Sequence, residues 1–451
     1  MNPPKSGSGS PRQPSLETAG APSLPLSGPL AVRVFLIFAF AYVLSYAFRA
    51  INAVIAPVLM QDLRLSHGDL GLLSSAYLIA FGLMQIPLGI GLDRVGSRRA
   101  EAALLVVGCT GALLFSLAHS LAALWIARAL IGAGVSACLM AALTAYRTWY
   151  PAERQGQLAS WMLVAGTSGV LLTTIPAQSL LPAVGWRGIF GGMAVLMAAA
   201  IVLIWSLPRI GEKPLRNVWR PRETDPRTDT HAHDRGYGMI FRHPYFLRTM
   251  LLGLINYGGF TAIQTLWIGP WMTTVLGHSA NGTARVLFWI NLTLLAGFLF
   301  NGWLAPKLAR RGIPLVHYAM ALMAMGIGAQ AVIVALGPRG TWWLWLFFAL
   351  GATGYILYQC TIGPAFPAIR AGRANTAHNL LLFTGAFIWQ WAIGLAIDAL
   401  KSSGASPQRA FQTTFGAFLL IQCFGWAWFF VAPRLTRVAP FSGANGPPSP
   451  S

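Results

Sequence analysis

A positively charged side chain, Arg49, lies inside a long apolar stretch of the chain. Tyr46 and Asn52 recur around it at helical spacing, so the three side chains share one face of a helix. A guanidinium within an apolar helix costs at least about 2.5 to 3.5 kcal/mol on insertion scales, so we expect Arg49 to face water or an anion rather than lipid. Such a face can bind an anionic group reversibly. A structural arginine bonded to backbone carbonyls is the alternative.

Polar side chains in later apolar stretches extend this candidate site. Gln264 and Tyr358 could line the same cavity, although a polar side chain in a membrane helix more often forms an interhelical hydrogen bond. One guanidinium suits one carboxylate or another single-charge anion better than a dianionic phosphate. The sequence therefore predicts a polar site that faces water or an anion, with Arg49, Tyr46, Asn52, Gln264 and Tyr358 as the candidate substrate-binding residues.

The 12 carboxylates of the chain all lie outside the middle of the apolar stretches. The sequence therefore predicts no acid buried at mid-membrane depth. Asp398 and His378, near the two ends of one stretch, are the remaining titratable candidates, and both are expected at the membrane interface. A proton stays open as the coupling ion, because the substrate itself could carry it.

No catalytic residue, metal site or cofactor is predicted. Covalent chemistry usually needs a positioned acid or base, and the apolar stretches contain no histidine and carboxylate constellation. His231 and His233 lie in a charged segment without nearby cysteines, which argues against a metal site. The chain also has no Walker loop for ATP. We therefore expect a protein that is not an enzyme.

The elements that must position these residues follow from the composition. With 451 residues, 55% of them hydrophobic and only 10% charged, the chain is too apolar for a soluble globule. Its net charge of +20 does not indicate nucleic acid, because the arginines lie between apolar runs rather than along a basic groove interleaved with aromatics. The sequence predicts an all-α polytopic protein in contact with membrane lipid, with helices near 31–58, 69–91, 101–118, 121–146, 157–182, 187–208, 246–276, 282–306, 314–337, 341–368, 375–400 and 411–432.

The apolar stretches fall into two groups separated by a charged segment that cannot enter lipid. We expect a multi-pass monomer in the cytoplasmic (inner) membrane with both termini cytoplasmic, since most lysines and arginines then lie on the cytoplasmic side. The predicted parts are a disordered tail (1–30), a six-helix bundle (31–208), a cytoplasmic linker (209–245), a second bundle (246–433) and a disordered tail (434–451).

Internal repetition supports this division. One shift in numbering carries Ala56-Pro57 onto Gly269-Pro270 and also carries Gly89 onto Gly302. Two separate elements therefore share one offset, which predicts two parallel six-helix repeats with a solute site between them.

Two motifs resemble a known family. The basic turn between the second and third apolar stretches resembles the corresponding loop of major facilitator superfamily transporters, through Gly89, Asp93, Arg94, Gly96, Arg98 and Arg99. A second resemblance, to the superfamily's Arg-x-x-x-Gly-x-Gly motif, lies in the fourth stretch at Arg128, Gly132 and Gly134. The resemblance implies twelve transmembrane helices, transport by alternating access, and a conformational switch at the basic turn.

Within that switch, Gly89 is expected to let two helices approach closely. For Arg128, snorkelling to the membrane interface is an open alternative to a functional role.

The first stretch resembles particular branches of this superfamily. Tyr46-x-x-Arg49, followed by Pro57, is similar to the first span of organic-phosphate and anion:cation symporters, where the matching arginine binds the anionic group of the substrate. The resemblance implies a secondary transporter, symporter or antiporter, for a small organic anion. The alternatives are efflux of an amphipathic drug or siderophore-like compound, a membrane-embedded transferase, and a transport-dead sensor.

Overall fold

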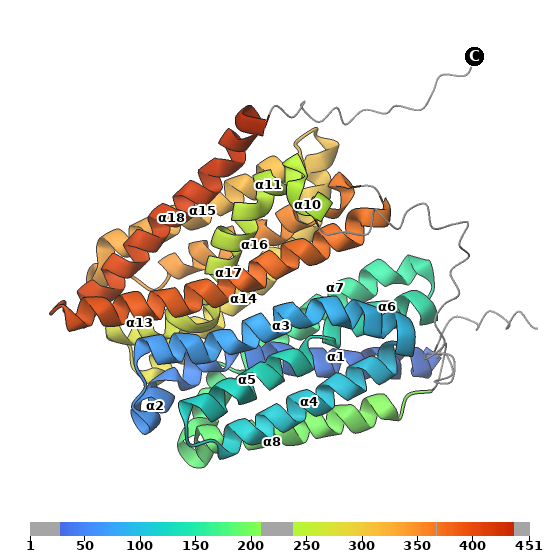
Figure 1. Cartoon of the computed structure of the whole chain (residues 1–451), viewed down its shortest axis with the longest axis horizontal. Helices are drawn as coiled ribbons and strands as arrows, with labels where there is room; N and C mark the ends of the chain where they lie inside the picture. Colours follow the sequence, from blue (N-terminus) through green and yellow to red (C-terminus); the bar gives the residue numbers. More distant parts are fainter. Residues whose placement is uncertain (1–27, 209–237, 367, 437–451) are drawn as a thin grey trace, which may run out of the picture.

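The computed structural model describes residues 28–208, 238–366 and 368–436, and it is helical throughout its regular structure. The helices form two bundles that lie side by side (Figure 1), α1 to α8 in one and α10 to α18 in the other. Each bundle has a main cluster of buried apolar side chains, and each cluster also includes a few side chains of the other bundle. The long helices α3 and α17 pack along each other where the bundles meet. The predicted tails before residue 28 and after 436, and residues 209–237 of the predicted linker, lie outside the described residues.

The first bundle begins with a broken helix. Helix α1 ends just before Ile51, and α2 continues the same span in a new direction. Further helices follow through short turns, and the glycine at the turn between α3 and α4, Gly96, has a φ of 84°. The helices of this bundle are α1 (Gly28–Ala50), α2 (Asn52–Leu63), α3 (His67–Val95), α4 (Ser97–Leu117), α5 (Leu121–Val135), α6 (Cys138–Trp149), α7 (Ala152–Leu172) and α8 (Ile175–Trp205).

The second bundle starts at Gly238, inside the segment predicted as linker. Its first span is interrupted by two π-helical segments, η2 and η3, which bracket a short α-helix. The elements are α10 (Gly238–Arg242), α11 (Pro244–Leu251), η2 (Leu252–Tyr257), α12 (Gly258–Ala262), η3 (Ile263–Trp267), α13 (Ile268–Thr274), α14 (Ala280–Arg310), α15 (Leu315–Leu336), η4 (Gly337–Arg339), α16 (Leu344–Gln359), η5 (Gly363–Ala365), α17 (Ala368–Ser402) and α18 (Pro407–Thr436).

Across the described residues, 11 helical segments are long and apolar enough to cross a membrane, and 157–172 forms a shorter apolar helix. The span predicted at 157–182 is broken at Thr173 and Thr174, so its second part belongs to α8. Helix α8 itself bends at Gly185, whose φ is 64°. Counting the broken span as one, the arrangement agrees with the predicted twelve helices in two six-helix repeats.

Equivalent glycines bring equivalent helices together in the two halves. A Cβ added to Gly134 of α5 would lie 2.2 Å from the backbone nitrogen of Gly108 in α4. A Cβ added to Gly351 of α16 would lie 2.4 Å from the backbone nitrogen of Gly326 in α15. These helix pairs are backbone-to-backbone contacts that only glycine permits. The duplication inferred from the basic turn therefore recurs in the packing of a different pair of helices.

Replacing Gly134 by alanine tests this contact. The added methyl overpacks the α4–α5 interface, a change that typically costs about 1 to 3 kcal/mol, so the melting temperature of the purified protein is expected to fall. Thermal unfolding followed by tryptophan fluorescence measures the change. The matched control is Gly328→Ala in α15, where a Cβ meets no atom within 4 Å and helix propensity favours alanine. Equal melting temperatures for the two variants would contradict the contact.

Candidate functional site

A cavity of about 100 Å³ lies between the two halves, near the middle of the spans. Helices α1 and α7 of the first half and η2, α12, η3, α14 and α16 of the second contribute its walls. Of the described residues that line it, Arg49 alone carries a charge. The remaining lining residues are Tyr46, Ala50, Leu163, Thr167, Val170, Tyr257, Phe260, Thr261, Gln264, Thr265, Asn291, Leu294, Phe298, Ala352 and Ile356.

Arg49 is surrounded by aromatic rings. Its guanidinium carbon lies 4.8 Å from the ring centre of Tyr46, 4.9 Å from that of Phe81 and 5.6 Å from that of Phe383. Its Nε is buried without a hydrogen-bond partner. Aromatic faces attract a cation but leave its N–H groups free to donate. The aromatic surroundings therefore hold Arg49 at the cavity wall with donors available for an anion.

The wall opposite Arg49 offers amide groups. Gln264 in η3 donates from Nε2 to Oδ1 of Asn291 in α14 over 2.7 Å, and Asn291 donates onward to the Leu287 carbonyl over 2.7 Å. π-helical turns leave the regular i→i+4 pattern and often occur at functional sites. Hydrophobic periodicity contains no signal for them. The sequence therefore identified Gln264 but neither its partner Asn291 nor the π-helical turn that carries it.

Two of the five predicted binding residues do not line the described cavity. Asn52 is 1% exposed and donates from Nδ2 to the Ser74 hydroxyl in α3 over 2.8 Å. Tyr358 is fully buried, and its hydroxyl donates to the Thr249 carbonyl over 2.9 Å. In this conformation both side chains tie helices together within their own half.

Arg128 is 1% exposed, so it does not snorkel to the interface. It donates from Nη1 to the Phe48 carbonyl over 3.0 Å, just before α1 breaks at Ile51. Carbonyls at the end of a helix lack intrahelical donors. A Cβ on Gly132, one turn further along α5, would lie 2.2 Å from the Tyr77 carbonyl oxygen in α3. The arginine–glycine motif therefore fixes the broken span that carries Arg49.

The basic turn is only partly a contact surface in this conformation. Arg98 is 3% exposed and donates to the Trp205 carbonyl over 2.8 Å and to the Leu207 carbonyl over 3.3 Å, both at the end of α8. Gly89 is exposed, and a Cβ built there meets no atom within 4 Å. The close helix approach predicted at Gly89 is therefore absent here. Arg94 is exposed as well, whereas the Asp93 side chain lies outside the described residues.

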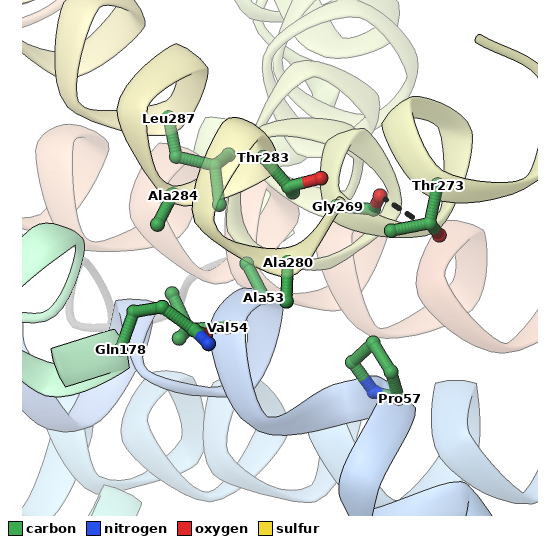
Figure 2. Close-up of a pocket in the computed structure, with 10 residues that line it drawn as sticks. All are labelled: Ala53, Val54, Pro57, Gln178, Gly269, Thr273, Ala280, Thr283, Ala284 and Leu287. Carbon is green, nitrogen blue, oxygen red and sulfur yellow. Dashed lines mark hydrogen bonds between the residues drawn. The ribbon is translucent and has the colours of Figure 1, made fainter. Parts of the chain in front are cut away.

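Towards the end of the bundle where α2 ends and α3 and α14 begin, the space between the halves narrows. We call this the closed end. A second cavity of about 10 Å³ continues the first along α2 and α14, with room for about one water molecule. Figure 2 shows its lining, with Ala53 and Pro57 facing Gly269 and Thr273 of α13. A Cβ on Gly269 would lie 2.4 Å from the Ala53 carbonyl oxygen, so α2 and α13 close the path with their backbones.

A carboxylate crosses between the halves at the closed end. Asp398 of α17 accepts hydrogen bonds from the backbone N–H groups of His67 and Gly68, over 3.2 and 2.6 Å, and lies 2.8 Å from Nδ1 of His67. It thereby caps the N-terminus of α3, a position that favours negative charge. Nearby, the Gln390 carbonyl oxygen leaves no room for a Cβ on Gly71 of α3. Asp398 of the second half therefore accepts hydrogen bonds from the free backbone N–H groups at the start of α3 in the first half.

Two titratable side chains are buried inside the protein. Glu101 in α4 has 0% exposure. His378 in α17 also has 0% exposure, and its ring packs edge-on against Tyr358. Both lie towards an end of their helix, so the absence of an acid at mid-membrane depth and the interface position of His378 stay predictions.

Two six-helix repeats around a polar cavity with one cation define a class: polytopic membrane proteins of the transporter type, with a solute site between the halves. The family model of the Major Facilitator Superfamily matches residues 38–390. The chain belongs to this family. It is a multi-pass membrane protein of the transporter type and not an enzyme.

Three similar proteins illustrate the relationship. The hexuronate transporter of Escherichia coli (strain K12) is 25% identical over 307 residues, which cover 66% of this chain and 69% of that protein. The membrane sensor protein UhpC of the same organism is 25% identical over 407 residues, covering 84% of this chain and 89% of that protein. The crystal structure of a bacterial homologue of the lysosomal transporter Spinster has a TM-score of 0.71 at 17% identity and covers 92% of this chain and 100% of its own. That likeness concerns the fold.

Asp398→Asn is expected to loosen the closed end. Asparagine has no charge for the α3 N-terminus and one acceptor oxygen in place of two. A cysteine introduced at Thr273, in a chain whose four native cysteines are replaced by serine, should then react faster with a membrane-impermeant maleimide added from the closed end. Reaction rates measured in membrane vesicles provide the readout.

The matched control for that measurement is Asp69→Asn. Asp69 also caps α3, but it bonds only with Ser66 of its own half. Its loss should leave the reaction rate at Thr273→Cys close to that of the parent. A rate unaffected by Asp398→Asn would show that the contact does not hold the halves together.

Proposed function

We propose that this protein is a secondary transporter that moves a small organic monoanion across the cytoplasmic membrane by alternating access. The observation that carries the proposal is the single guanidinium of Arg49 at the wall of a cavity between two repeats. Its unpartnered Nε and aromatic neighbours leave its charge without a protein counter-ion. A carboxylate entering the cavity supplies that counter-ion through charge-assisted hydrogen bonds.

The cavity wall suits a solute that also carries neutral polar groups. Gln264, Asn291 and Thr261 offer amide and hydroxyl groups opposite Arg49, and Tyr257 and Phe260 add aromatic surface. This combination fits a hydroxylated or aromatic carboxylate. The similarity to a hexuronate transporter supports the sugar-acid form of the proposal.

The orientation follows from charge. The ends of α3 and α14 carry Arg94, Lys307 and Arg310, whereas the opposite, closed end has fewer lysines and arginines, among them Arg64 and Lys401. Positive loops stay in the cytoplasm, so we assign the closed end to the outer side and both termini to the inner side of the membrane. The cavity is formed by one chain, so a monomer suffices for binding.

The two halves, 31–208 and 246–433, would rock about the cavity as units. The glycine contacts of α4 with α5 and of α15 with α16 stiffen each half internally. The contacts between the halves at the closed end, through Asp398 and Gly269, would break on opening. The predicted linker, which is helical from Gly238 on, would join the halves on the inner side.

Arg49→Ala is expected to weaken anion binding by about 10- to 100-fold, because hydrogen bonds to charged groups contribute roughly 1.5 to 3 kcal/mol. A thermal-shift screen of the purified protein against sugar acids and aromatic monocarboxylates identifies a ligand, and calorimetric titration then gives the Kd. Arg310→Gln is the matched control, since it removes one positive charge from an exposed position outside the cavity. An unchanged Kd in Arg49→Ala would contradict the assignment of the anion site.

Proteoliposome counterflow separates the remaining alternatives. Exchange of the carboxylate, without exchange of cationic dyes, is expected for an anion transporter. Exchange of cationic dyes would instead favour drug efflux. Ligand binding without any flux would favour a sensor, the function named for the relative UhpC.

A further inference from the structure

The buried acid Glu101 has no role in the site described above. It lies in the first turns of α4, with 0% exposure, and neither of its carboxyl oxygens has a hydrogen-bond partner. An ionised carboxylate without a counter-charge is strongly disfavoured in a dry protein interior. The Glu101 side chain therefore carries its proton in this conformation.

The surroundings of Glu101 contain no described cation. Its titratable neighbours are the Cys138 thiol and the Tyr146 phenol, both on α6. Helices α3, α5 and α8 also pack on α4, and no described titratable side chain on them faces the carboxyl. On α4 itself, Arg98 lies one turn away but donates to the Trp205 and Leu207 carbonyls.

A line of polar side chains leads from Glu101 towards the substrate cavity. The Cys138 thiol, beside Glu101, also lies beside Ser45 of α1, and it is close enough to Tyr42 of the same helix to act on it electrostatically. The Tyr42 hydroxyl donates to the Tyr46 hydroxyl over 3.3 Å, and Tyr46 lines the cavity. The Tyr46 ring lies in turn against Arg49. A shift of α1 on substrate binding would therefore change the surroundings of Glu101.

We propose that Glu101 is a proton-binding site that couples proton movement to transport. In the conformation described here its carboxyl is protonated. When α1 shifts on substrate binding and water enters between α4 and α6 of the first half, the ionised form is stabilised and the proton passes to the aqueous phase, leaving the carboxylate. The reverse rearrangement takes up a proton again. The inference rests on the proposed transport function, and it assigns the coupling ion to the protein rather than to the substrate.

The test uses proteoliposomes of the full chain with a carboxylate found in the screen and a pH-sensitive dye inside the vesicles. For one proton per monoanion, a pH gradient of one unit supports up to about tenfold accumulation. We expect the wild-type protein to accumulate substrate and to move protons with it. Glu101→Gln, which imitates the protonated side chain, should keep counterflow but lose both proton movement and gradient-driven accumulation.

Two further variants make the test specific. Glu101→Asp keeps a titratable group and should retain coupling, which a merely structural role for the side chain would not require. Asp62→Asn removes an acid at the end of α2 but keeps an oxygen that can accept the hydrogen bond from Trp186 Nε1, so it should behave as the wild type. Gradient-driven accumulation retained by Glu101→Gln would overturn the inference. So would coupling lost equally in Glu101→Asp, or loss of counterflow together with accumulation in a folded Glu101→Gln.

The wild-type measurement keeps the two proposals apart. Counterflow without accompanying proton movement would refute the role of Glu101 and leave the transport proposal intact. The absence of any counterflow, for every carboxylate that binds, would refute transport itself. Should Glu101→Gln yield no folded protein, the dye signal in the wild type and in Glu101→Asp decides the question.

Discussion

The rest of the structure depends on keeping one positive charge, Arg49, away from lipid. Its helix would be costly to insert if the guanidinium faced hydrocarbon. The broken first span, held at the Phe48 carbonyl by Arg128, places that guanidinium at the boundary between the halves. Cation–π contacts with aromatic rings then stabilise the guanidinium without neutralising its charge. Because Arg49 needs a polar environment, the helix face that carries it must lie at the boundary between the two repeats.

The contacts that hold the molecule together are of two kinds. Within each half, glycines such as Gly134 and Gly351 allow helix backbones to touch, and these contacts are extensive and dry. Between the halves at the closed end, glycine contacts such as that of Gly269 with Ala53 occur as well, and the carboxylate of Asp398 meets backbone N–H groups of His67 and Gly68. These hydrogen bonds exchange readily for hydrogen bonds with water. Their loss allows the halves to separate without unfolding.

The sequence was sufficient for the features that arise from periodicity, charge and repetition. It predicted the two repeats, the bundle architecture, and Arg49, Tyr46 and Gln264 at one cavity, because a charge or amide in an apolar helix must find a polar surface. It failed where the outcome depends on helix rotation. Asn52 and Tyr358 point into their own half, since a shift of 100° per residue turns a side chain from cavity to core. Span ends were also displaced, by about one turn at the C-terminal end of α3.

The second, smaller cavity at the closed end has a consequence for the proton gradient across the membrane. It has room for about one water molecule, and the backbones of α2 and α13 close it at Gly269. A continuous file of water would let protons hop through the protein and dissipate the membrane gradient without useful work. A chamber with room for one molecule interrupts such a file. The narrow closed end therefore limits the leakage of protons through the protein, so that the membrane gradient is preserved while the larger cavity stays accessible to a solute.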